Sequence, residues 1–384
     1  MKEILTLNPV SPLVEKVLGA DYSVKKEAAE PVGIIVRSFE MKEYPLPQSV
    51  RAVARAGAGV NNIPVDEYAK KGVVVFNTPG ANANAVCELV LAAMLLGSRK
   101  IVPAIEWVNS LKGCENLSKE VEKDKKRFVG GELLGKKVGV VGLGAIGAKV
   151  ANAALALHMD VLGYDPFLSV HAALNLSHRV KVTSDLDELF KTCDYITLHV
   201  PMTEKNRGMV GEKQIAMMKD GAVVINCARG ELVDAAAIKA AAESGKIGRY
   251  ITDFPCDELI GAENVICIPH LGASTPEAED NCAVMAANEL KDYLENGTIV
   301  NSVNYPACSA PRNSAVRLVL LHLNQQNMIA QFTAVLAENG VNIDNFVNSS
   351  KGAYACSIID IPTVTNEALA ALEKIDGVIS LRKI

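Results

Sequence analysis

Residues 135–166 read GKKVGVVGLGAIGAKVANAALALHMDVLGYDP, and this stretch decides the fold. The β-branched run from Lys137 to Val141 predicts a strand, the alanine-rich segment after it predicts a helix, and a second strand ends at Asp165. Between the first strand and the helix lie three glycines in a GxGxxG pattern, Gly142, Gly144 and Gly147. The first permits the tight turn, the second lets a pyrophosphate approach the backbone, and the third lets the helix pack on the strand.

Asp165 completes the pattern of a dinucleotide site. A pyrophosphate would sit at the N-terminus of the helix, where backbone N–H groups are unpaired. Asp165 would accept hydrogen bonds from the adenosine ribose hydroxyls and would repel a 2′-phosphate. The sequence therefore predicts NAD rather than NADP as the cofactor.

The bulk composition excludes several classes of protein. A chain of 384 residues predicts two or three domains, and a formal net charge of −5 argues against nucleic acid or an anionic membrane as a partner. The nine cysteines form neither a CxxC pair nor a Cys/His cluster, so we expect reduced thiols, no metal site and a cytoplasmic location. The first apolar run is too short for a signal peptide, and no stretch is apolar enough to span a bilayer.

Strand and helix patterns alternate along most of the chain, which predicts parallel sheets. We expect a long helix over 85–108 and a charged loop over 119–128. A capping-box sequence at Ser274, with Pro276 in the first turn, predicts a helix that ends at Gly297. Strands are expected at 3–7, 32–38, 50–57, 72–78, 194–200, 222–228, 249–254 and 264–270.

The last seventy or so residues show a different order of strands and helices. After a linker that contains Pro306 and Pro311, the elements run strand, helix, strand, strand, helix, strand. This βαββαβ order predicts a ferredoxin-like unit. The fold class is thus α/β, with two doubly wound parallel-sheet domains followed by the ferredoxin-like unit.

Three polar residues follow strands downstream of the glycine-rich turn, namely Arg229, Glu258 and His270. The carboxyl ends of parallel strands converge on one crevice, so these side chains are candidates for one site. Oxidation of a 2-hydroxy acid needs a base for the hydroxyl proton, which suits a histidine, and a cation for the carboxylate, which suits Arg229. Glu258 could hold the other imidazole nitrogen. Each residue taken alone is more often a packed histidine, a turn acid or a solvated arginine.

Four motifs resemble those of the NAD-dependent D-2-hydroxyacid dehydrogenases. They are GLGAIG (142–147), LHVPMT (198–203), NCARGELVD (226–234) and PHLGAST (269–275). VARAGAGVNNI (53–63), NTPGANANAVCE (77–88) and the tail are similar to the phosphoglycerate branch that carries a C-terminal ACT domain. The resemblance implies a substrate-binding domain (1–93 and 285–304), a Rossmann-type NAD-binding domain (94–284) and an ACT regulatory domain (314–384).

The same resemblance assigns roles to residues. It makes Arg229, Glu258 and His270 the catalytic trio. Around the cofactor it places Gly142, Gly144, Ala145, Ile146, Gly147, Asp165, Val200, Pro201, Cys227, Ala228, Arg229, Asp253, His270, Leu271, Gly272 and Ala273. Against the substrate it places Gly59, Val60 and Asn77, with Arg37 and Arg55 at the substrate phosphate. The resemblance leaves open which of Lys125, Lys126 and Arg127 also reaches the substrate, and Leu259 departs from the proline that relatives often have.

The implied function is oxidation of 3-phospho-D-glycerate to 3-phosphohydroxypyruvate, the first step of phosphorylated L-serine biosynthesis, in a homodimer or homotetramer. Two alternatives remain, a dehydrogenase for another acid such as glycerate or lactate, and an NAD-sensing corepressor-like binding protein. In the tail, His322, Asn324 and Asn342 match the serine-binding residues of ACT domains, so L-serine is the expected effector. Gln326 and Asn327 stand where such relatives usually carry Pro-Gly.

Overall fold

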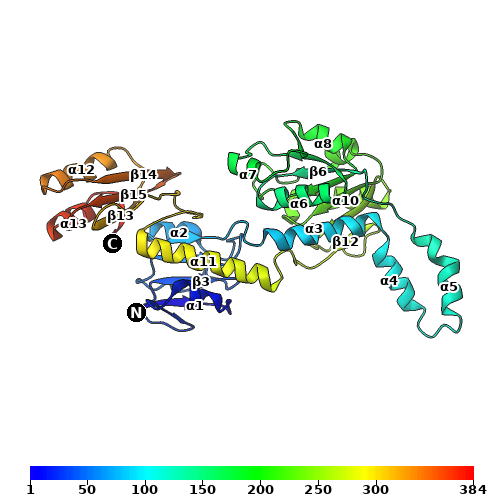
Figure 1. The fold of residues 1–384 in the computed structure, drawn as a ribbon, viewed down its shortest axis with the longest axis horizontal. Coiled ribbons are helices and arrows are strands. Elements are labelled where there is room, and N and C mark those ends of the chain that lie inside the picture. Colours follow the sequence, from blue (N-terminus) through cyan, green and yellow to red (C-terminus); the bar gives the residue numbers. More distant parts are fainter. The chain divides into compact units, whose positions relative to one another are not determined.

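The computed structural model describes residues 1–384, except for the side chain of His171. The chain forms two compact units (Figure 1). One contains Met1–Ala81 and Pro276–Ile384, and the other contains Asn82–Thr275. These transitions fall at the start of helix α3 (Ala83–Ser98) and of helix α11 (Pro276–Asn296), whereas the sequence-based boundaries at 93/94 and 284/285 fall inside the two helices.

The first unit begins with a five-stranded parallel sheet in the order β2-β1-β3-β4-β5. Its strands are β1 (Lys2–Thr6), β2 (Tyr22–Lys25), β3 (Gly33–Val36), β4 (Ala52–Arg55) and β5 (Val74–Phe76). Helices α1 (Leu13–Leu18) and α11 pack on one face, and α2 (Val65–Lys70) packs on the other. Four strands were expected. The fifth, β2, is a short edge strand with only one buried residue, so its sequence lacks the apolar run that marks the others.

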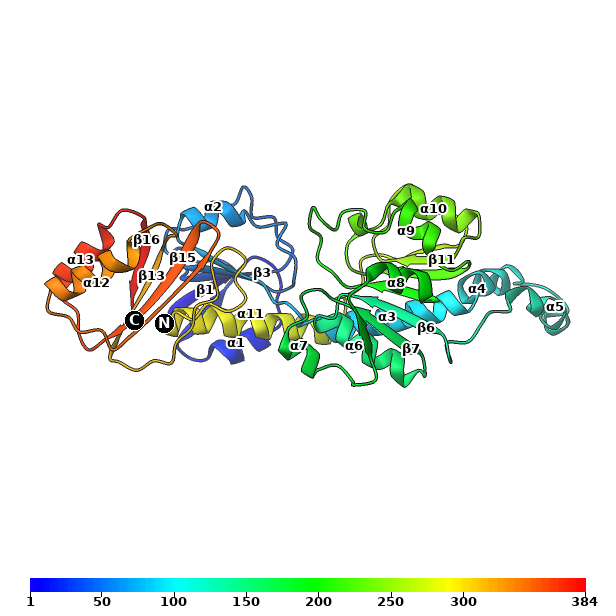
Figure 2. The ribbon, with the colours of Figure 1, turned by 90° about the horizontal axis from the view of Figure 1, so that it is seen from above.

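The second unit is built on a seven-stranded parallel sheet in the order β12-β11-β10-β9-β6-β7-β8. The strands are β6 (Lys137–Val141), β7 (Asp160–Tyr164), β8 (Lys181–Thr183), β9 (Tyr195–Leu198), β10 (Ala222–Asn226), β11 (Ile247–Thr252) and β12 (Val265–Cys267). Helices α3 and α6 (Ala145–Ala156) cover one face. Helices α8 (Leu186–Thr192), α9 (Glu212–Met217) and α10 (Ala235–Glu243) cover the other (Figure 2). The short helix α7 (Val170–Leu174) follows β7.

Two sequence-based expectations in this unit were wrong. The pattern over 85–108 is two helices, α3 and α4 (Ile101–Ser110), because Arg99 adopts an extended conformation with φ −121° and ψ 139°. The charged segment over 119–128 is helical rather than a loop and forms α5 (Leu117–Asp124) and the 3₁₀ turn η1 (Lys125–Phe128). Ion pairs three residues apart, such as Lys123 with Glu120, support that helix. Helices α4 and α5 form an arm that projects from the unit (Figure 1).

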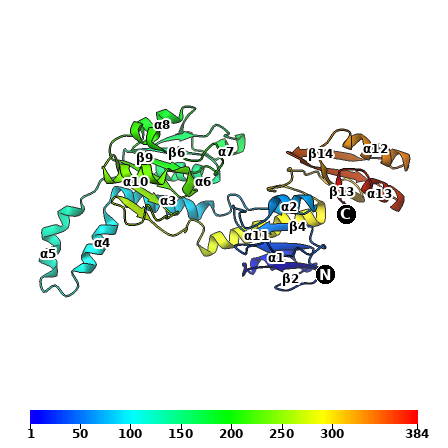
Figure 3. The same ribbon diagram turned by 180° about the vertical axis from the view of Figure 1, so that it is seen from behind.

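The C-terminal residues form an antiparallel sheet in the order β14-β15-β13-β16. Along the chain, its elements follow the βαββαβ succession that the sequence predicted. The elements are β13 (Val316–Leu323), α12 (Met328–Glu338), β14 (Asn345–Lys351), β15 (Tyr354–Ile361), α13 (Asn366–Glu373) and β16 (Val378–Lys383). Figure 3 shows the two helices on one side of this sheet. Side chains of the opposite face, such as Val319 and Ile358, share a core with Tyr293 of α11.

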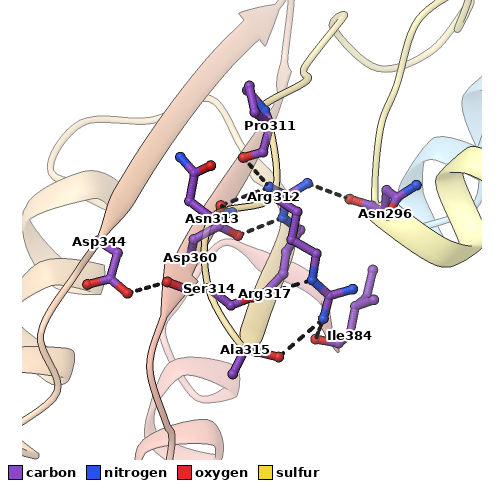
Figure 4. A network of polar contacts seen from close by, with 10 residues as sticks. All are labelled: Asn296, Pro311, Arg312, Asn313, Ser314, Ala315, Arg317, Asp344, Asp360 and Ile384. Carbon is purple, nitrogen blue, oxygen red and sulfur yellow. Dashed lines mark hydrogen bonds and ion pairs between the residues drawn. The ribbon is translucent and has the colours of Figure 1, made fainter.

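Two arginines of this sheet bind the last carbonyl groups of α11. Arg317 donates from Nη1 to the Asn296 carbonyl at 3.1 Å, and Arg382 donates to the carbonyls of Tyr293 and Leu294 at 3.2 and 2.9 Å. Arg317 also forms two hydrogen bonds with Asp360 (Figure 4). The unpaired carbonyls at a helix C-terminus carry partial negative charge, so both guanidinium groups stabilise that end of α11.

Within the part of the chain that the structure describes, no helix is both long enough and apolar enough to cross a membrane. The same described residues contain no group of three or more histidine, cysteine, aspartate or glutamate side chains that could hold a metal ion.

Candidate active site

The glycine-rich turn lies at the topological switch point of the seven-stranded sheet. It follows β6, whose neighbours are β7 on one side and β9 on the other. Gly142 has φ +91°, and a Cβ there would lie 2.5 Å from the carbonyl oxygen of His199, so only glycine fits. Ligands of open α/β sheets bind at such a point.

The other two glycines of the turn differ in the space around them. A Cβ on Gly147 would lie 1.8 Å from the Gly142 carbonyl oxygen, which shows how closely α6 approaches the turn, while a Cβ on Gly144 would meet no atom within 4 Å. Gly144 caps α6 without a side-chain hydrogen bond. The first N–H groups of α6, at Ala145 and Ile146, therefore have no side-chain cap, and uncapped N–H groups at a helix start are where an anion binds.

Asp165 lies directly after β7 beside this turn. Its Oδ2 accepts a hydrogen bond from the Leu143 backbone N–H and its Oδ1 accepts one from Phe167, each at 2.9 Å. The carboxylate is thus fixed at the edge of the turn. Recognition of a ribose by Asp165 stays a prediction.

His199 was not singled out from the sequence. It follows β9, its Nε2 shares a 3.0 Å hydrogen bond with Thr197 Oγ1, and burial lowers its pKa to about 4. The imidazole is therefore neutral near pH 7. We interpret it as a support beneath the glycine-rich turn, with the predicted cofactor neighbours Val200 and Pro201 next in the chain.

Arg229 lies in a loop that Asn226 holds from within the core. Asn226 is fully buried, accepts from the Ala228 N–H at 3.2 Å and donates to the Arg229 carbonyl at 2.8 Å. Thr252 Oγ1 donates to the Asn226 carbonyl at 2.9 Å, which ties the end of β10 to the end of β11. Asn226 has a positioning role that the sequence alone did not reveal.

Asp253 is a buried carboxylate close to two predicted site residues. Burial raises its pKa, and the charges of His270 and Arg229 oppose that shift together with a hydrogen bond from the Gly272 N–H to Oδ2 at 3.2 Å. Its Oδ1 is buried without a partner among the described residues. That oxygen is the kind of acceptor that a bound cofactor would satisfy.

His270 and Glu258 are not brought together in this structure. The ring of His270 packs on Phe254 with a centroid separation of 4.6 Å, whereas Glu258 is exposed in the turn after β11. No hydrogen bond or ion pair joins the two among the residues described. The predicted pairing of Glu258 with the imidazole therefore remains a prediction.

The other predicted cofactor neighbours lie on the same edge of the sheet, after β10 and β12. Burial, with the charge of Asp253, raises the pKa of Cys227 to about 12, so its thiol is unreactive. Leu271 is exposed, Gly272 is buried, and Ala228 and Ala273 are half-buried.

In the first unit, Arg37 directly follows β3, and Arg55 is the last residue of the neighbouring strand β4. Asn8 Oδ1 accepts hydrogen bonds from three successive backbone N–H groups, those of Arg37, Ser38 and Phe39, at 3.2, 3.1 and 2.9 Å. Arg55 Nε donates to the Arg37 carbonyl at 3.1 Å. The structure thus brings the two predicted phosphate ligands together, and Asn8 is a support that the sequence did not reveal.

Asn77 supports the predicted substrate loop of the same unit. Its Nδ2 donates to the Ala58 carbonyl at 2.6 Å, directly before Gly59 and Val60. Its own N–H donates to the Asn301 carbonyl at 3.2 Å. Gly59 and Val60 are half-buried.

The three predicted effector residues occupy different environments. His322 is 2% exposed, and its Nε2 lies 3.2 Å from Asn348 Oδ1 and 3.1 Å from Ser357 Oγ. Asn324 lies beyond the end of β13 and donates to the Gly352 carbonyl at 3.0 Å. Asn342 is exposed and donates to Asp344 Oδ1 at 3.3 Å.

Comparison with known proteins identifies the family. Residues 91–272 match the NAD-binding domain of D-isomer-specific 2-hydroxyacid dehydrogenases. A D-3-phosphoglycerate dehydrogenase of Haemophilus influenzae is 33% identical over 339 residues, which are 84% of this chain and 78% of that protein. The chain belongs to the D-2-hydroxyacid dehydrogenase family. The D-3-phosphoglycerate dehydrogenase of Methanocaldococcus jannaschii is 37% identical over 79% of this chain.

Solved structures agree with this family assignment. The NAD⁺-bound 3-phosphoglycerate dehydrogenase of Entamoeba histolytica has a TM-score of 0.61 against this chain at 26% identity. The match covers 79% of this chain and 98% of that one. The chain spans about half the length of several D-2-hydroxyacid dehydrogenases that it matches, 55% in the case of the Methanocaldococcus jannaschii protein.

Proposed function

We propose that the protein oxidises the C2 hydroxyl of 3-phospho-D-glycerate with NAD to give 3-phosphohydroxypyruvate, the first step of phosphorylated L-serine biosynthesis. The observation that carries this proposal is the hydrogen bond from Arg55 to the Arg37 carbonyl, which gathers two arginines at the ends of β3 and β4. Two guanidinium groups suit a phosphate dianion. The names of the relatives from Haemophilus influenzae and Methanocaldococcus jannaschii support the same substrate.

His270 is the proposed base. One of its imidazole nitrogens accepts the proton of the C2 hydroxyl, a task that suits a group with an ordinary pKa near 6.5. NAD, when bound, supplies the acceptor for the hydride that leaves C2. Glu258 reaches the other imidazole nitrogen when substrate is present and stabilises the protonated ring.

Arg229 binds the substrate carboxylate. Its backbone is fixed by Asn226, while its Nη1 donates to the neighbouring Ala228 carbonyl at 2.6 Å. That local hydrogen bond can be exchanged for a carboxylate, because a pair in which both donor and acceptor are charged is the stronger interaction. Asp253 keeps the loop after His270 in place through Gly272.

A panel of 2-hydroxy acids tests the activity through NADH formation. We expect phosphoglycerate to be oxidised much faster than glycerate or D-lactate, with Arg37→Ala and Arg55→Ala lowering phosphoglycerate turnover far more than glycerate turnover. Equal turnover of phosphoglycerate and glycerate would replace the proposal with a dehydrogenase for an unphosphorylated acid. Turnover of no hydroxy acid, with NAD still bound, would favour the corepressor-like binding protein.

We also propose that residues 314–384 are an ACT regulatory domain that binds L-serine. Its ferredoxin-like order and the polar residues His322, Asn324 and Asn342 support this role. The buried state of His322 means that serine would have to bind near Asn324 and Asn342 or displace internal hydrogen bonds. Calorimetric titration of the full chain with serine, repeated on Asn342→Ala, tests this, and the absence of both binding and inhibition at millimolar serine would reject it.

A homodimer or homotetramer is the proposed assembly in a reducing, cytoplasmic environment. Ile101, Ile105 and Val108 lie on one face of α4 and are 40%, 56% and 45% exposed. An exposed apolar stripe on a projecting arm is typical of a protein interface. Light scattering of the wild type and of Ile105→Glu measures the mass, and a monomeric wild type would contradict the proposal.

A further inference from the structure

Arg37 has a partner that neither the sequence nor the proposed reaction accounts for. Its Nη2 lies 2.6 Å from Oε1 of Glu279, which is in the first turn of α11. The two side chains are 41% and 44% exposed. In the proposed phosphate site, Arg37 is therefore already paired with a carboxylate.

The surroundings show that these charges form one cluster. Arg55 is held against the loop of Arg37 through its hydrogen bond to the Arg37 carbonyl. Cys282 lies one turn along α11 from Glu279. Burial raises the pKa of its thiol, the charges of Arg55 and Arg37 oppose the shift, and the charge of Glu279 adds to it. Arg37, Arg55 and Glu279 are thus all close enough to Cys282 for their charges to act on it.

An exposed ion pair of this kind is easily exchanged. Half-exposed pairs contribute up to about a fivefold change in an equilibrium constant, since water and salt screen the attraction. A phosphate dianion presents the same oxygen acceptors as a carboxylate and carries more charge. Phosphate can therefore replace Glu279 at Arg37, and the energy of the lost pair is subtracted from the binding of phosphate.

We propose that Glu279 is an internal competitor for the anion site, a positioning residue that holds Arg37 in the empty protein and lowers the affinity for phosphate. The proposal rests on the proposed function only in taking the phosphate to be that of the substrate. The carboxylate weakens binding of phosphorylated substrate and product alike, so it favours product release. It leaves binding of an unphosphorylated acid unchanged, because such an acid does not need Arg37.

Calorimetric titration of the full chain with inorganic phosphate tests the inference without turnover. Glu279→Gln keeps the length and an acceptor oxygen but removes the charge, and we expect phosphate to bind about three- to fivefold more tightly. Glu277→Gln is the matched control, because Glu277 is an exposed acid in the same turn of α11. We expect its phosphate affinity to stay within about twofold of the wild type, as a charge that is not paired with Arg37 contributes little.

A double-mutant cycle with Arg37→Ala separates the pair from the general field of the carboxylate. In the Arg37→Ala background, Glu279→Gln should no longer tighten phosphate binding. In turnover assays, Glu279→Gln should lower KM for phosphoglycerate while leaving KM for glycerate unchanged.

Unchanged or weaker phosphate binding by Glu279→Gln would overturn the inference. An equal gain in phosphate affinity from Glu277→Gln would also overturn it, as would an equal gain from Glu279→Gln in the Arg37→Ala background. The absence of phosphate binding in every variant would also overturn it. If Glu279→Gln binds phosphate more tightly but the protein oxidises no phosphoglycerate, the result would support the role of Glu279 as a competitor and reject the proposed reaction.

Discussion

Arg317 and Asp360 form a fully buried ion pair, with Nε 2.6 Å from Oδ1 and Nη2 2.8 Å from Oδ2. Figure 4 shows the other contacts of the guanidinium, to the carbonyls of Asn296 and Pro311. Every charged group in this network has a hydrogen-bonding partner within it. The pair joins the ferredoxin-like sheet to the end of α11.

Arg317→Met is expected to destabilise the protein by about 3–5 kcal/mol, because it leaves the Asp360 carboxylate buried without its cation. The double variant Arg317→Met/Asp360→Leu should recover part of that loss. Denaturant unfolding measures both. If the double variant is no more stable than Arg317→Met, the loss of stability comes from the missing hydrogen bonds between Arg317 and α11 and not from the unpaired Asp360 carboxylate.

The same pair predicts an acid sensitivity. Burial by itself raises the pKa of Asp360, but the hydrogen bonds and charge of Arg317 outweigh it and lower the pKa below its usual value. The stabilisation is therefore present above the ordinary carboxyl pKa and is lost as the pH falls through the folded-state pKa. Melting temperature against pH should fall less steeply on the acid side in Arg317→Met/Asp360→Leu than in the wild type.

His270→Gln should lower kcat by at least about a hundredfold, the usual contribution of a general acid–base residue. NAD binding should be intact, since the glycine-rich turn and Asp165 are on other strands. Steady-state kinetics and a cofactor titration measure the two quantities. Near-normal turnover would remove His270 from the mechanism.

Asp165→Ser should narrow the preference for NAD over NADP, because it relieves the repulsion of a 2′-phosphate. Asp165 also accepts the Leu143 N–H, so some loss of affinity for both cofactors is expected. The ratio of the two kcat/KM values is therefore the informative measurement. An unchanged ratio would assign cofactor choice to another residue.

Glu289→Gln should stabilise the protein at alkaline pH. Burial raises the pKa of Glu289 to about 7, against the hydrogen bond that its Oε1 accepts from Asn301 at 2.6 Å. A raised carboxyl pKa gives stability that is present below the unfolded-state pKa and lost as the pH rises through the folded-state pKa. Between pH 5 and pH 8 the melting temperature of Glu289→Gln should therefore rise by a few degrees relative to that of the wild type. Parallel curves of melting temperature against pH would contradict the raised pKa of Glu289.

The sequence determined the elements and their order wherever the signal is local. The glycine-rich turn was predictable because Gly142 and Gly147 are required by backbone geometry within a few residues of each other. The ferredoxin-like tail followed from apolar periodicity. Arg229, Glu258 and His270 were singled out from their positions after strands, and their catalytic roles stay predictions. Local signals failed at Arg99, where a continuous apolar pattern hides an extended residue between two helices.

Only the tertiary structure decided which distant residues meet. Asn8 supports Arg37 across 29 positions of sequence, and Arg317 meets Asp360 across 43. Glu279 reads in the sequence as one acid of a helical first turn, and only the packing of α11 on the first sheet brings it to Arg37. The physical reason is that a hydrogen bond or ion pair depends on positions to within an ångström, whereas a sequence pattern fixes only periodicity and direction.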